Sequence, residues 1–158
     1  VIAEHHIKFF IIGDGPEKDD LVGFAQEKNL QNVGFIPNKP RDEIPSIIAG
    51  CDAYIVPLKK LDLFLGAIPS KLFEPLAMGK PVILGVDGEA RDLFINKGNC
   101  GLYYEPEDST GLVQCIYKLY HNRQLAQELG ENGRKYVREK FDRTKIADEF
   151  YQELLKIV

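Results

Sequence analysis

Residues 69–85 read P-S-K-L-F-E-P-L-A-M-G-K-P-V-I-L-G, a short helical pattern followed directly by an apolar strand. Pro69 suits the first turn of a helix, and the Ser70 hydroxyl can accept a hydrogen bond from a free backbone N–H there. A glycine and a proline then end the helix. The apolar residues 82–84 are typical of a strand buried in a parallel sheet. This stretch therefore predicts a helix over residues 69–78 inside an α/β fold.

Two charged side chains, Lys71 and Glu74, lie three residues apart in this helix and therefore share a face. A helix N-terminus offers free N–H groups and the positive end of a dipole, which together suit a diphosphate. Lys71 can add a full positive charge to the same phosphates, and the Glu74 carboxylate can accept hydrogen bonds from two ribose hydroxyls. The pattern suits a nucleotide-sugar site, and the spacing alone leaves a solvated Lys–Glu pair open as the alternative interpretation.

Strands and helices alternate along the chain. Strands are expected at residues 7–12, 33–36, 53–57, 82–84 and 102–104. Helices are expected at residues 17–28, 41–49, 69–78 and 89–96, and in several segments after residue 108, the last over 144–157. This alternation predicts an α/β fold with a doubly wound parallel sheet and C-terminal helices. Ligands of such sheets bind beyond the carboxyl ends of the strands.

The first strand and helix also carry a prediction about burial. The apolar run at residues 7–12 is typical of a strand that is buried on both faces. In the helix that follows, Leu21, Phe24 and Ala25 are spaced so that they face the sheet.

Composition narrows the class of protein. The chain has 158 residues, 44% hydrophobic and 28% charged, which suits one soluble domain. A net charge of -4 argues against a nucleic-acid partner, because tracking phosphates needs clustered Lys and Arg. The three widely spaced cysteines indicate reduced core thiols and a cytoplasmic location. The sequence has no signal peptide and no 18-residue apolar run, which is the length that a membrane-spanning helix needs. It starts without an initiator Met, and we therefore expect it to be part of a longer protein.

The stretch at 69–85 resembles the retaining glycosyltransferases of family 4 (group 1), in particular the C-terminal, nucleotide-binding lobe of their GT-B architecture. Other landmarks of that family follow in the right order: I-I-G-D-G-P at 11–16, N-V-G-F-I-P at 32–37, C-D-A-Y-I-V-P-L at 51–58 and G-N-C-G-L-Y-Y at 98–104. The resemblance implies a Rossmann-like fold and makes residues 1–158 the donor-binding domain of an enzyme whose N-terminal acceptor lobe lies outside this chain.

The resemblance also implies an activity. The full-length enzyme would transfer a sugar from a nucleotide-diphospho-sugar, with UDP as the expected nucleotide, to a glycan, lipid-linked or polysaccharide acceptor. No metal ion or other cofactor is expected. This chain alone is expected to be inactive and to hold no catalytic residue, because it lacks the acceptor lobe and the Arg/Lys pair that family members carry just before this segment.

Residue roles follow from the same resemblance. Glu74 matches the second glutamate of the family's E-x7-E pair, which binds ribose, and its neighbours Ser70, Lys71 and Leu72 belong to the same donor site. Gly66 stands where many members have the first glutamate, which faces the sugar. The P-S-K-L-F-E form is similar to a branch that commonly lacks that glutamate, such as transferases that build surface polysaccharides from aminosugar nucleotides.

Two further segments are assigned by the resemblance. The nucleobase is expected against the rim formed by Phe35, Ile36 and Pro37, where a buried strand and a proline turn are the alternative interpretation. Gly13 and Gly15 belong to a turn that borders the cleft between the lobes. They do not complete a dinucleotide-binding fingerprint, because a lysine occupies the third glycine position, so a tight strand-to-helix turn is expected.

Other charged groups give weaker signals. Asp87-Gly88-Glu89 resembles a D-x-D motif, but Glu89 is expected in the first turn of a helix, with a contact to the donor sugar as the alternative. No set of carboxylates, histidines or cysteines has the spacing of a metal site. The mixed charges of residues 131–145 favour a solvated helical face over peripheral contact with a membrane.

Two other functions stay open at this point. A nucleotide-sugar 2-epimerase shares the two-lobed architecture and would need carboxylates aimed at the sugar C2 proton. A non-catalytic nucleotide-binding module is conceivable because the glutamate expected at Gly66 is missing.

Overall fold

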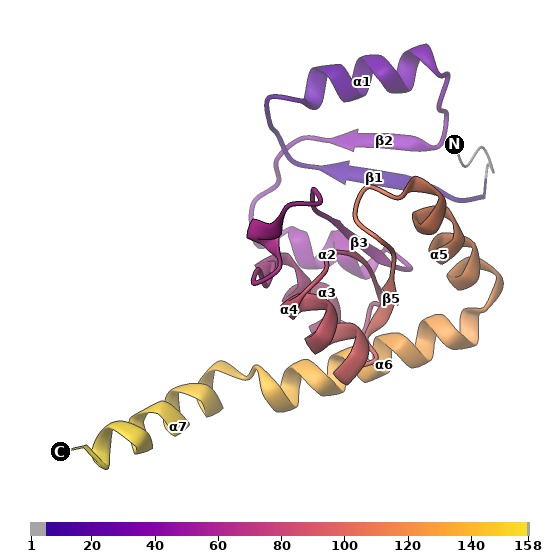
Figure 1. Cartoon of the computed structure of the whole chain (residues 1–158). Coiled ribbons are helices and arrows are strands. Elements are labelled where there is room, and N and C mark those ends of the chain that lie inside the picture. Colours follow the sequence, from indigo (N-terminus) through magenta and orange to yellow (C-terminus); the bar gives the residue numbers. More distant parts are fainter. Residues whose placement is uncertain (1–5, 158) are drawn as a thin grey trace. The chain divides into compact units, whose positions relative to one another are not determined.

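The computed structural model describes residues 6–157, which divide into two compact units. The first unit ends at Ser46 and the second begins at Ile47. Figure 1 colours them along the sequence, the first in indigo and violet and the second from purple through magenta and orange to yellow.

The first unit is a β-α-β crossover. Strands β1 (Phe9–Ile12) and β2 (Val33–Ile36) run parallel, and helix α1 (Lys18–Glu27) connects them (Figure 1). Parallel neighbours need such a crossover because a tight hairpin can join only antiparallel strands. Both strands and the helix lie where the sequence predicts them. Helix α2 (Ile44–Ala49) starts later than predicted and spans the boundary between the units.

Burial in this unit differs from the prediction. The Phe10 side chain is 54% exposed and Ile11 is exposed as well, so β1 is not buried on both faces. The reason is that β2 is the only strand paired with β1 in the described part of the chain. In α1 only Ala25 is buried, whereas Leu21 and Phe24 are exposed, because two strands offer too little surface to cover a broad helical face.

The second unit contains a three-stranded parallel sheet in the order β3-β4-β5. The strands are β3 (Tyr54–Pro57), β4 (Val82–Gly85) and β5 (Gly101–Tyr103). All four residues of the central strand β4 are buried, as expected of an apolar strand with a neighbour on each side. The sequence places each of these strands correctly to within one residue.

Helices and short turns connect and follow the strands of this sheet. Between the strands lie the 3₁₀ turns η1 (Asp62–Phe64) and η2 (Ser70–Leu72), helix α3 (Phe73–Ala77) and helix α4 (Glu89–Arg91), which continues as the π-helical turn η3 (Asp92–Lys97). After β5 come α5 (Ser109–His121), α6 (Arg123–Lys140) and α7 (Arg143–Leu155). Side chains cap the start of the last three helices, namely Asp108, Asn122 and Asp142. None of the described helices combines the length and the apolar character needed to cross a bilayer.

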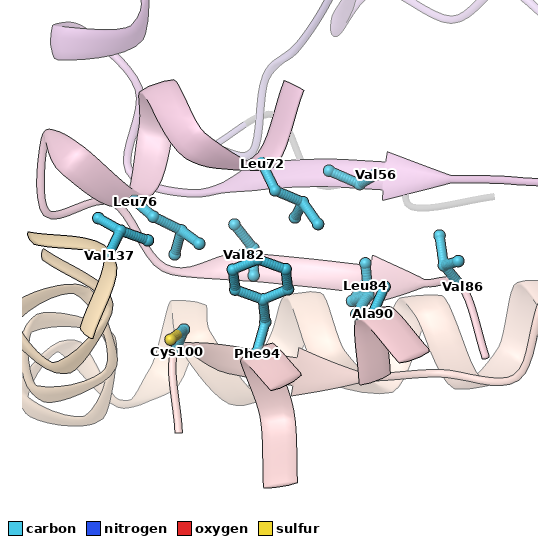
Figure 2. Close-up of a cluster of buried hydrophobic side chains, with 10 residues drawn as sticks. All are labelled: Val56, Leu72, Leu76, Val82, Leu84, Val86, Ala90, Phe94, Cys100 and Val137. Atoms are coloured by element: carbon cyan, nitrogen blue, oxygen red, sulfur yellow. The ribbon is translucent and has the colours of Figure 1, made fainter. Parts of the chain in front are cut away.

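The core of the second unit lies between the sheet and its helices (Figure 2). Its buried members are Val56, Leu72, Leu76, Val82, Leu84, Val86, Ala90, Phe94, Cys100 and Val137. The Phe94 ring stacks on Phe141 at 5.5 Å between centroids and meets Phe73 edge to face at 5.7 Å. Burial raises the pKa of the Cys100 thiol to about 12, and all three cysteines are free thiols.

One glycine sets the spacing inside the sheet. Gly101 opens β5 directly opposite Val82 of β4. A Cβ at this position would collide with the Val82 carbonyl oxygen, so the two backbones can approach only with glycine here.

We expect Phe94→Ala to lower the free energy of unfolding by about 3–5 kcal/mol, because it removes a fully buried ring and leaves a cavity among three aromatic neighbours. Urea denaturation of both variants measures the change. Leu63→Ala is the control, since that side chain is 81% exposed. Equal stability of the two variants would show that the cluster in Figure 2 is not the core.

Candidate functional site

The stretch predicted to bind the donor lies between β3 and β4, but it is not one regular helix. Residues Ser70–Leu72 form the 3₁₀ turn η2, and the α-helix α3 begins at Phe73. Pro75 gives the reason, because it has no N–H to donate to the carbonyl of residue 71. The Ser70 side chain makes no capping hydrogen bond, so that part of the prediction is wrong. The helix ends just before Gly79, as predicted.

Lys71 in η2 and Glu74 in α3 are both exposed. Neither side chain forms a hydrogen bond or an ion pair with another residue of the described chain, which both the donor site and the solvated alternative allow. The Glu74 charge lies close enough to Tyr54 to help raise the pKa of that phenol, although burial of the ring is the larger cause. Both charged groups therefore keep hydrogen-bonding capacity that no other described residue uses.

Leu72 lies between these two residues in the sequence and, unlike them, is buried. Its side chain is fully buried in the core cluster and points toward the sheet (Figure 2). Leu72 can therefore offer a ligand only its backbone. Its burial fixes the turn that carries Lys71 and Glu74 to the core of the second unit.

The other predicted site residues belong to the first unit. Gly13, Gly15 and Phe35 contribute to one hollow of about 350 Å³, which also includes Ile11, Ile12, Asp14, Pro16, Glu17, Lys18 and Leu21. Ile36 contributes a backbone contact, since its carbonyl accepts a hydrogen bond from the Gly13 N–H at 3.0 Å, and Pro37 follows as an exposed residue.

The G-D-G-P segment forms the tight strand-to-helix turn that the sequence predicts. Within it the Gly15 N–H donates to the Asp14 carboxylate at 3.1 Å, and the Lys18 N–H donates to the Gly15 carbonyl at 3.1 Å. The Lys18 ammonium also lies 3.5 Å from Asp14. Local contacts therefore account for the shape of this turn.

The structure adds a polar network that sequence reasoning missed. The Asp87 carboxylate pairs with Arg91 at 3.2 Å, and the Arg91 guanidinium lies 3.8 Å from the centre of the Tyr103 ring. The Tyr103 hydroxyl donates to Glu105 at 2.7 Å, and Glu105 pairs with Lys60 at 2.7 Å. These contacts connect segments that follow β3, β4 and β5.

The network lowers the pKa of both its carboxyl groups. The hydrogen bond from Lys60 is the main cause that lowers the pKa of Glu105, and the Gly88 N–H and then Arg91 lower the pKa of Asp87. Burial is the main cause that raises the pKa of the Tyr103 phenol to about 12.

A smaller hollow of about 180 Å³ adjoins this network. It is lined by Lys59, Lys60, Leu61, Asp62, Phe64, Leu65, Val86, Asp87, Glu105 and Pro106. One signal in the sequence points to it, because these residues follow the carboxyl ends of neighbouring parallel strands. Glu89 begins α4 with an exposed side chain, as predicted. Within residues 6–157 no three His, Cys, Asp or Glu side chains are grouped to hold a metal ion.

Comparison with known proteins gives the family. The model of the family "Glycosyl transferases group 1" matches residues 2–136. The chain is 29% identical over 135 residues to an uncharacterized glycosyltransferase of Methanocaldococcus jannaschii, covering 85% of this chain and 37% of that protein. It is 24% identical to the N-acetyl-alpha-D-glucosaminyl L-malate synthase of Bacillus anthracis, covering 99% of this chain and 40% of that protein. The chain thus spans about two fifths of the length of these relatives.

Solved structures share the fold. The Anabaena protein HepE, solved with UDP and glucose, has a TM-score of 0.82 and 21% identity, over 98% of this chain and 42% of that one. The sucrose-phosphate synthase of Thermosynechococcus elongatus has a TM-score of 0.78 and 23% identity, over 94% and 39%. The predicted α/β fold with parallel strands and C-terminal helices is confirmed. Since the family model covers most of its residues, the chain belongs to the group 1 glycosyl transferases.

Proposed function

We propose that this chain is the C-terminal, donor-binding domain of a GT-B glycosyltransferase of family 4. The full-length enzyme transfers a sugar from a nucleotide-diphospho-sugar, UDP-linked in our proposal, to a glycan, lipid-linked or polysaccharide acceptor. Its partner is an N-terminal lobe of the same enzyme, which supplies the acceptor site. The three free thiols suit a reducing compartment, so we assign the enzyme to the cytoplasm.

The observation that carries this proposal is the exposed, unpaired couple of Lys71 and Glu74. A nucleoside diphosphate presents a negatively charged pyrophosphate beside a ribose with two neighbouring hydroxyls. A lysine and a glutamate one turn apart match these two groups, because the ammonium donates to phosphate and the carboxylate accepts from a diol. Ser70 and the Leu72 backbone complete this part of the donor site in our assignment.

The nucleobase is assigned to the rim of the first unit. The hollow beside Gly13, Gly15 and Phe35 has apolar walls from Ile11 and Leu21, which suit the face of a flat base. This assignment rests on residues of the first unit alone, and the assignment of ribose and phosphates rests on residues of the second.

Names of the relatives and neighbours support a UDP-linked donor. HepE was solved in complex with UDP-glucose, which supports the nucleotide, and a 2-deoxystreptamine N-acetyl-D-glucosaminyltransferase of Niallia circulans is a relative whose name gives only the sugar and the acceptor. A Cβ added at Gly66 would meet nothing within 4 Å, so the missing glutamate leaves open space next to the backbone. We propose that the donor sugar is bound by groups other than a carboxylate at this position.

The product formed from the donor alone distinguishes a glycosyltransferase from an epimerase. The full-length enzyme, given UDP-N-acetylglucosamine without an acceptor, should release no epimerised nucleotide sugar. Epimerised product in the NMR spectrum of the reaction would replace the transferase assignment with the epimerase.

We expect Glu74→Ala in the full-length enzyme to weaken UDP binding roughly tenfold to hundredfold, because hydrogen bonds to a charged group contribute about 1.5–3 kcal/mol. Calorimetric titration measures the loss. In the wild type, 2',3'-dideoxy-UDP should bind more weakly than UDP, and in the variant the two should bind alike. Glu128→Ala, an exposed glutamate on α6, is the control. Unchanged UDP affinity in Glu74→Ala would overturn the ribose assignment.

Lys71→Met tests the phosphate assignment separately. The variant should bind UDP roughly tenfold more weakly, because it loses one charge-assisted hydrogen bond to phosphate, while its affinity for uridine stays the same. Titrations with both ligands measure this difference, and Lys135→Met on α6 is the control. A similar loss of affinity for uridine would show that Lys71 does not act on the phosphates.

A further inference from the structure

The loop that leads into the proposed donor site is poorly anchored by its own side chains. It runs from Leu58 to Pro69, between β3 and η2. Four of its apolar side chains are exposed, namely Leu61, Leu63, Leu65 and Ile68, whereas Leu58 at its start packs against the core cluster. Local turns shape it, such as the bond from the Ala67 N–H to the Phe64 carbonyl at 3.0 Å. Beyond Leu58, the position of the loop relative to the core therefore depends on contacts with other segments.

The main contact comes from the turn between β4 and α4. The Glu89 N–H donates to the Leu65 carbonyl at 2.7 Å. Gly88 passes so close to Leu65 that a Cβ on it would collide with that carbonyl. Gly88 also has φ of 77°, a conformation that favours glycine. The approach of these two segments thus depends on a glycine at this position.

The turn that makes this contact is itself fixed to the core. Val86 precedes it and Ala90 follows it, and both side chains are buried in the cluster of Figure 2. The ion pair between Asp87 and Arg91 closes the turn at 3.2 Å. A segment held at both ends and closed across its middle can serve as a fixed support for the loop.

A second contact holds the same loop near its start. Lys60 pairs with Glu105, which also accepts a hydrogen bond from the Tyr103 hydroxyl. This pair is exposed, so its contribution to stability is small. It restricts the start of the loop, and the contact at Leu65 restricts the end that leads to Lys71.

We propose that the turn at Asp87–Glu89 is a positioning element for the donor site and that Gly88 is its decisive residue. The inference rests on the proposed function of Lys71 and Glu74. The turn holds the backbone at Leu65, and this limits the positions open to the chain that continues to Ser70 and Lys71. The backbone of the turn performs this role, and the Glu89 side chain takes no part in it.

Gly88→Ala in the full-length enzyme tests the proposal. The added methyl group should push Leu65 away, weaken UDP binding roughly tenfold or more, and speed amide hydrogen exchange across residues 61–69. Gly101→Ala is the matched control, because its methyl group also collides with a backbone carbonyl, but at the opposite, amino end of the strands. It should lower stability without weakening UDP binding at a temperature where it stays folded.

A second pair of variants leaves Gly88 unchanged and acts at the N–H of Glu89. Glu89→Pro removes the N–H that bonds to Leu65 at a position where a helix accepts proline, since Glu89 is the first residue of α4. Glu89→Ala keeps that N–H and removes only the carboxylate. We expect loss of UDP affinity and faster exchange of the loop in Glu89→Pro alone. Equal losses in both variants would assign the role to the side chain and overturn the proposal.

The outcomes separate this inference from the proposed function. If wild type binds UDP and Glu74→Ala does not, unchanged affinity in both Gly88→Ala and Glu89→Pro overturns the positioning role and leaves the donor site intact. If the wild type fails to bind UDP, the proposed function fails. Hydrogen exchange of residues 61–69 then still tests the contact, and unchanged exchange in both variants overturns it.

Discussion

The buried strand β4 is the constraint on which the second unit depends. Its four residues have no exposed side, with β3 and β5 as parallel neighbours and the core cluster against its face. The turn with Lys71 and Glu74 comes just before this strand, and the turn with Gly88 comes just after it. An apolar strand of this kind cannot move without exposing its side chains. The two turns joined to its ends are therefore held in place where they meet the strand.

Charges are distributed unequally around this strand. Beyond its carboxyl end, Asp87, Arg91, Glu105 and Lys60 satisfy one another in a network that includes the Tyr103 ring. Lys71 and Glu74, on the turn before the strand, have no such partners in the described chain. Paired charges hold segments together, whereas unpaired charges keep their bonding capacity for a ligand. This contrast is the physical basis for assigning support to one group and binding to the other.

Sequence reasoning succeeded where a short pattern is enough to determine the structure. The apolar run at β4 and the glycine-bounded turn after β1 lie where expected. It was wrong about burial in the first unit, because exposure of Phe10 and Leu21 depends on which elements cover them. It also did not predict that Pro75, which has no N–H, shortens the helix. Ser70 therefore lies in a 3₁₀ turn, and its side chain does not cap that turn.

By itself the sequence determined the order of strands and helices, the core strand β4, and the choice of Lys71 and Glu74 as candidates. Each of these depends on residues a few positions apart, where backbone geometry and hydrophobic periodicity act directly. Only the tertiary structure decided that Gly88 supports Leu65 and that Glu105 pairs with Lys60. These residues are far apart along the chain, and only the pairing of parallel strands brings their carboxyl ends, and the segments that follow them, to one edge of the sheet.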